Sequence, residues 1–140
     1  MGELTFQLSA THLAGAETKV EAKQVSLKID TSLTGSQREL NPIELLLASQ
    51  AACFIKGIER VAPTLNFAFS RVSLSLTAQR PETEARISKL AYRIEIETEE
   101  SDSRLELLHK NLKRQGTIFN TISATTNMHG EVVRVTSASS

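Results

Sequence analysis

Cys53 is the only cysteine in the chain, so no disulfide can form within one molecule. At helical spacing Lys56 follows it by three residues, while Ser49 and Gln50 precede it by four and three. A nearby lysine favours the thiolate, the reactive form of cysteine, and Ser49 or Gln50 could hydrogen-bond an attacking or leaving oxygen. The alternative is structural, because free cysteine is often buried and packs as a small hydrophobe.

Other residue types offer little further chemistry. His12, His109 and His129 lie in three different predicted elements and show no ligand spacing with one another or with Cys53, so we interpret them as surface residues. A phosphate-cradling glycine loop and a paired-cysteine metal motif are both missing from the sequence. We therefore expect no metal and no cofactor.

The element that carries the thiol is a helix predicted from Pro42 to about Val61. Asn41 suits the N-cap and proline suits the first helical position. Glu44 lies three residues after Asn41, where its carboxylate can reach back in a capping-box arrangement. Pro63 is expected to end the helix. Apolar residues surround much of its circumference, which predicts burial on more than one side, in a core or a dimer interface.

Half-buried strands are predicted wherever apolar and polar residues alternate with period two. These stretches are residues 4–8, 20–29, 72–78, 90–96 and 131–136. A second helix is predicted over residues 104–115, capped by Asp102 or Ser103 and stopped or bent by Gly116, with a short helical turn over 117–122. This order predicts a single α+β domain over residues 1–140.

Composition limits the partners and the location. The 140 residues contain 16 basic and 16 acidic side chains without clustering of the basic ones, which argues against nucleic-acid binding. Residues 1–15 do not resemble a signal peptide, and the longest apolar stretch is too short to span a membrane. We therefore expect a soluble cytoplasmic protein without a membrane partner, and a single cysteine fits a reducing compartment.

The stretch Leu40-Asn-Pro-Ile-Glu-Leu-Leu-Leu-Ala-Ser-Gln-Ala-Ala-Cys53-Phe54 resembles the OsmC/Ohr family of osmotically induced and organic-hydroperoxide-resistance proteins. The resemblance extends from about Thr18 to Val135. It implies an α+β, OsmC-like fold in which antiparallel sheets wrap around a long central helix. It also implies an intertwined homodimer with the two central helices packed back to back.

The resemblance further implies roles for single residues. In active family members the cysteine that matches Cys53 attacks a hydroperoxide and becomes a sulfenic acid, and a second cysteine condenses with it. That second position is Gly116 here, and a family glutamate is replaced by Ile43. Glu44 is the retained acid of the Asn-Pro-Glu-Glu motif, and Arg38 is the nearest candidate for the family's catalytic arginine.

Two functions remain open at this point. The first is a one-cysteine, thiol-dependent peroxidase in which Cys53 is oxidised by a small organic hydroperoxide and restored by an external thiol, with Lys56 and Arg38 supplying a positive field. The second is a non-catalytic dimer that binds a small hydrophobic molecule in a cleft near Cys53. The absence of a thiol at Gly116 and the replacement at Ile43 support the second, but of the two we predict the first, with the second as the alternative.

Overall fold

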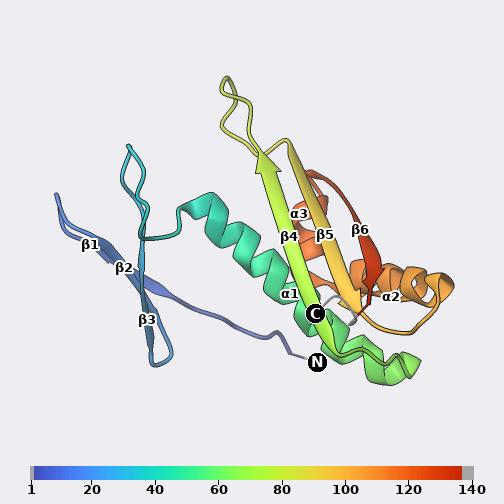
Figure 1. Cartoon of the computed structure of the whole chain (residues 1–140). Helices are drawn as coiled ribbons and strands as arrows, with labels where there is room; N and C mark the ends of the chain where they lie inside the picture. Colours follow the sequence, from blue (N-terminus) through green and yellow to red (C-terminus); the bar gives the residue numbers. More distant parts are fainter. Residues whose placement is uncertain (1, 137–140) are drawn as a thin grey trace. The chain divides into compact units, whose positions relative to one another are not determined.

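A computed structural model describes residues 2–136, in which three helices and two three-stranded sheets form a mixed α+β structure (Figure 1). These residues fall into two compact units that divide between Leu46 and Leu47. The α+β class is thus confirmed, while the single domain over residues 1–140 stays a prediction. Within the described residues, no helix is long and apolar enough to cross a membrane.

The N-terminal unit contains an antiparallel sheet of β1 (Ser9–His12), β2 (Thr18–Ala22) and β3 (Val25–Ile29). Two of its predicted boundaries are wrong. Residues 4–8 form no strand and are exposed. Residues 20–29 are two strands instead of one, because Lys23 adopts a positive φ of 57° and turns the chain into a two-residue hairpin between β2 and β3.

Apolar side chains of the N-terminal unit lie mostly at the surface. In its described part the buried residues are polar, Thr18 and Asp30, and no apolar residue is buried. Leu4, Phe6 and Leu33 are 86%, 85% and 104% exposed. The unit therefore has no apolar core of its own.

Helix α1 (Pro42–Leu65) begins where the sequence predicts. The Glu44 N–H donates to Asn41 Oδ1 at 2.8 Å, and the Asn41 N–H donates to Glu44 Oε1 at 2.9 Å, which is a complete capping box.

The end of α1 differs from the prediction, because the helix continues through Pro63 to Leu65. Asn66 ends it in the left-handed region, at φ 52°. The Phe67 N–H donates to the Ala62 carbonyl at 2.9 Å and the Asn66 N–H to the Pro63 carbonyl at 3.2 Å, which is a Schellman motif. A proline in the last turn removes only one helical N–H, so Asn66 sets the end instead.

The C-terminal unit contains a sheet of β4 (Arg71–Gln79), β5 (Lys89–Glu97) and β6 (Asn127–Val135). β4 and β5 pair antiparallel, but β5 and β6 pair parallel, so this sheet is mixed and departs from the expected antiparallel pairing. A parallel pair needs a crossover connection. Helices α2 (Asp102–Gln115) and α3 (Thr117–Ser123) supply it, and β6 begins four residues earlier than predicted.

The core of the C-terminal unit lies between the helices and one face of its sheet (Figure 1). Most of its apolar residues come from every second position of β5 and from one stripe of each long helix. They include Leu90, Tyr92, Ile94 and Ile96 on β5, Phe54, Ile58 and Val61 on α1, Leu105, Leu108 and Leu112 on α2, and Phe119 and Ile122 on α3. Ser101 caps α2, instead of the expected Asp102 or Ser103, by accepting from the Arg104 N–H.

Candidate active site at Cys53

Cys53 lies on α1 and is partly exposed. The short connection between α2 and α3 faces its sulfur at Gly116. A β-carbon on Gly116 would lie 3.7 Å from Cys53 Sγ, 2.8 Å from the Leu112 carbonyl oxygen and 3.2 Å from Phe119 Cβ. The structure therefore brings together Cys53 and the position where the family resemblance implies a second thiol. At that position the glycine has no side chain, so its backbone faces the sulfur.

An aromatic cluster adjoins Cys53 along the chain. The Phe54 and Tyr92 rings are 4.7 Å apart, and Phe119 lies 6.1 Å from Phe54 and 6.3 Å from Tyr92. Each of these rings is buried. The side of α1 next to Cys53 therefore faces an apolar core.

His109 belongs to this cluster, so its interpretation as a surface residue is wrong. Its ring is half-buried, and its Nε2 lies 2.6 Å from the Tyr92 hydroxyl. Burial, and to a lesser degree the charge of Lys113, lowers the pKa of His109 below its ordinary value. Burial raises the pKa of Tyr92 to about 12. Both groups are thus neutral at pH 7, and a hydrogen bond between neutral groups links β5 to α2.

Gln50 lies one helical turn before Cys53 and is completely buried. Neither its Oε1 nor its Nε2 has a hydrogen-bond partner within the described residues. A buried polar group left unpaired costs about 1–3 kcal/mol. In the sequence, Gln50 stands out as a polar residue in an otherwise apolar helix. Only the structure shows that both ends of its amide are buried and unpaired.

The other predicted site residues differ in placement. Lys56 is exposed on α1, one turn after Cys53 in the same unit. Glu44 forms the capping box with Asn41. Arg38 is exposed in the loop before α1, where its backbone N–H donates to Ser36 Oγ at 3.0 Å. Arg38 and Glu44 belong to the N-terminal unit, so their catalytic roles stay predictions.

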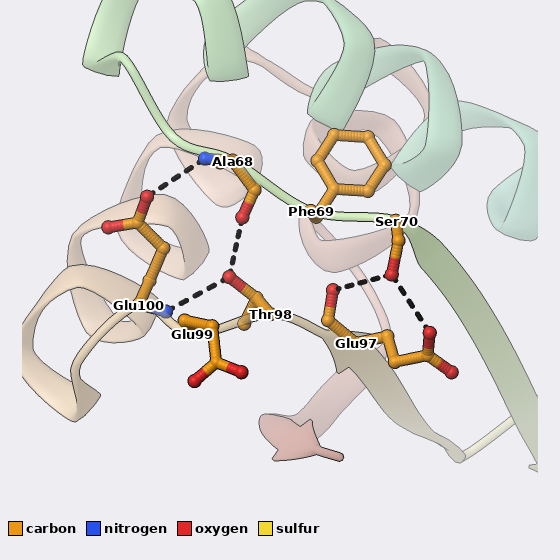
Figure 2. A pocket seen from close by; sticks show the side chains of 7 residues that line it. All are labelled: Ala68, Phe69, Ser70, Glu97, Thr98, Glu99 and Glu100. Carbon is orange, nitrogen blue, oxygen red and sulfur yellow. Dashed lines mark hydrogen bonds between the residues drawn. The ribbon is translucent and has the colours of Figure 1, made fainter. Parts of the chain in front are cut away.

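A cavity of about 530 Å³ lies in the C-terminal unit between residues 68–70 and 97–100 (Figure 2). Several of its polar groups form hydrogen bonds with one another. Glu100 Oε2 accepts from the Ala68 N–H at 2.8 Å, and Glu97 Oε1 accepts from Ser70 Oγ at 2.8 Å. These bonds brace two loops. Across residues 2–136, no group of three or more His, Cys, Asp and Glu side chains could hold a metal ion.

Comparison with known proteins assigns the chain to a family. The family model described as OsmC-like protein matches residues 34–129, which is more than half of the chain. The protein therefore belongs to the OsmC-like family. No curated protein sequence matches the chain.

Solved structures share the fold at low sequence identity. An OsmC-like protein from Mycoplasma pneumoniae superposes with a TM-score of 0.83 at 14% identity, covering 94% of this chain and 99% of its own. An organic hydroperoxide resistance protein from Legionella pneumophila superposes with a TM-score of 0.75 at 20% identity, covering 96% of this chain and 100% of its own. The organic hydroperoxide resistance protein OhrB of Bacillus subtilis superposes with a TM-score of 0.69 at 15% identity, covering 92% of this chain and 98% of its own. The expected OsmC-like fold is confirmed.

Proposed function

We propose that the protein is a one-cysteine, thiol-dependent hydroperoxide reductase that acts through Cys53 on small organic hydroperoxides. The observation that carries this proposal is the partly exposed sulfur of Cys53 facing Gly116, the position of the family's second thiol. Family membership and structural neighbours named organic hydroperoxide resistance proteins support it.

The proposed reaction needs only the thiol and two co-substrates. The Cys53 thiolate attacks the distal oxygen of the hydroperoxide, the O–O bond breaks, and the departing alkoxide takes a proton to become an alcohol. Cys53 is left as a sulfenic acid. An external thiol displaces water from it to give a mixed disulfide, and a second external thiol releases Cys53 with formation of the external disulfide. Lys56 and Arg38 are the proposed sources of positive charge.

We also propose that the protein acts as a homodimer. The exposed apolar side chains of the N-terminal unit support this proposal, because a second copy of the chain can remove them from water. A second copy of the chain is the partner that the family resemblance implies. Sedimentation at micromolar concentration should give a dimer, and a folded monomer would contradict the proposal.

Intact-protein mass spectrometry tests the chemistry. After treatment with tert-butyl hydroperoxide, Cys53 should carry one or two added oxygens without an intramolecular disulfide, and Cys53→Ser should carry none. Lys56→Met should slow the oxidation roughly two- to fivefold, as expected for an exposed charge. Arg60→Met, which removes an exposed cation two turns from the thiol, is the matched control and should slow it less.

An unmodified Cys53 in a correctly folded dimer would overturn the peroxidase proposal. The remaining function would then be the non-catalytic dimer that binds a small hydrophobic molecule near Cys53.

A further inference from the structure

The side-chain amide of Gln50 is a buried group of the C-terminal unit that has no hydrogen-bond partner within the described residues and that the proposed reaction does not yet use. It is 0% exposed, and both of its polar atoms lack a partner within the described residues. Buried polar groups in native proteins are nearly always hydrogen-bonded, so such an exception needs a physical reason. One such reason is a partner that is present only during a reaction.

Helix geometry places Gln50 beside the reactive sulfur. Residues three apart on a helix are surface neighbours, with β-carbons about 5–6 Å apart. Helical side chains also lean toward the N-terminus, so the side chain of Cys53 extends over the preceding turn, which contains Gln50. This spacing places Gln50 one helical turn from an oxygen that Cys53 Sγ would carry.

We propose that Gln50 binds the oxygen that Cys53 receives from the hydroperoxide. This inference rests on the proposed function. When the thiolate takes the distal OH group and the O–O bond breaks, Gln50 Nε2 donates to the new sulfenic oxygen and Oε1 accepts from the sulfenic O–H. The leaving alkoxide takes its proton from solvent.

The chemistry of the two groups is complementary. A primary amide offers donors on nitrogen and an acceptor on oxygen, and a sulfenic acid offers one O–H donor and oxygen lone pairs. The reduced protein leaves both ends of the amide unpaired, and oxidation pairs them. The same contact holds the sulfenic acid in one orientation and slows its further oxidation to the sulfinic acid.

Gln50→Leu separates this role from a structural one. The protein is treated with one equivalent of tert-butyl hydroperoxide, and the sulfenic acid is trapped with dimedone over time. We expect Gln50→Leu to form the trapped adduct roughly three- to tenfold more slowly than the wild type, as expected for loss of the hydrogen bonds between the amide and the transferred OH group. Its urea midpoint should equal or exceed that of the wild type, because an unpaired buried amide has been removed.

Asn111→Leu is the matched control. Asn111 is also a buried amide of the C-terminal unit, but it donates to the Leu107 carbonyl at 2.9 Å and accepts from Arg114 at 2.6 Å. We expect this variant to lose stability and to keep the oxidation rate of the wild type. Equal oxidation rates in Gln50→Leu and wild type, as for an amide that only holds an internal water, would overturn the role of Gln50 alone. Absence of the adduct in the wild type would overturn the proposed function as well.

A measurement on the wild type covers the case in which Gln50→Leu does not fold. The side-chain NH₂ signals of Gln50 in a ¹⁵N correlation spectrum should shift when Cys53 becomes the sulfenic acid. Unchanged Gln50 signals in a protein whose Cys53 is oxidised would overturn the inference.

Discussion

Introducing a thiol at Gly116 tests how closely the α2–α3 connection packs against Cys53. Gly116 has φ −81° and ψ 113°, a conformation open to any L-residue, so no backbone strain arises from the substitution itself. The new β-carbon would meet the Leu112 carbonyl oxygen at 2.8 Å and Phe119 Cβ at 3.2 Å, and the carbonyl cannot move without shifting the end of α2. Overpacking of this kind costs roughly 1–3 kcal/mol, partly offset by the lower entropy of the unfolded chain, about 0.4–1 kcal/mol.

Reduced Gly116→Cys and Gly116→Ala should therefore each lose roughly 1–2 kcal/mol of unfolding free energy relative to the wild type. Oxidation should reverse this for the cysteine variant only. Its β-carbon lies 3.7 Å from Cys53 Sγ, close enough for a disulfide after a small shift. A disulfide that closes a loop of roughly 60 residues stabilises by about 4 kcal/mol, so oxidised Gly116→Cys should exceed the wild type by about 2 kcal/mol.

Urea unfolding with and without dithiothreitol measures these differences, with Gly116→Ala as the control for the β-carbon alone. Two results would refute the reasoning. Gly116→Ala as stable as the wild type would mean that the connection has room for a side chain. Oxidised Gly116→Cys with two free thiols would mean that Gly116 does not face Cys53 in solution.

Two further predictions concern His109 and the start of α1. The folded state holds the pKa of His109 below its ordinary value, mainly through burial, so the unfolded chain binds the proton more readily. The urea midpoint of the wild type should therefore fall as the pH drops below about 6.5. The urea midpoint of His109→Gln should fall less between pH 8 and pH 5. Asn41→Ala removes the acceptor of the Glu44 N–H and should cost about 1 kcal/mol of unfolding free energy, whereas Glu44→Gln keeps an acceptor oxygen and should cost less. A Glu44→Gln protein of unchanged stability but much slower Cys53 oxidation would instead assign Glu44 a catalytic role.

Features that depend on nearby residues could be predicted from the sequence. The start of α1 is set by Asn41, Pro42 and Glu44, which satisfy one another within a single turn. The strands β4 and β5 follow from the alternation of apolar and polar residues, because the helices cover only one face of their sheet.

Features that depend on distant residues, or on an unusual local conformation, could not be predicted from the sequence. Lys23 adopts a left-handed conformation that lysine rarely takes, so the sequence gives no sign of the β2–β3 turn. The parallel register of β6 depends on β5, about 40 residues earlier, and no local pattern specifies it. At the site, Cys53, Lys56 and Gln50 follow from helical spacing, but the place of Gly116 against the sulfur depends on how α2 packs on α1.

The parallel pairing of β5 and β6 has a consequence for the order of folding. Its crossover runs through α2, Gly116 and α3, so the backbone that faces Cys53 lies in the loop that must close before β6 can join the sheet. Contacts between residues far apart in the chain form slowly, because the entropy of loop closure is lost before they stabilise. The N-terminal strands and α1 also leave the ribosome before β6 is made. We therefore expect Cys53 to be a more accessible thiol on the growing chain, and to gain its final surroundings only after α2, Gly116 and α3 have been made.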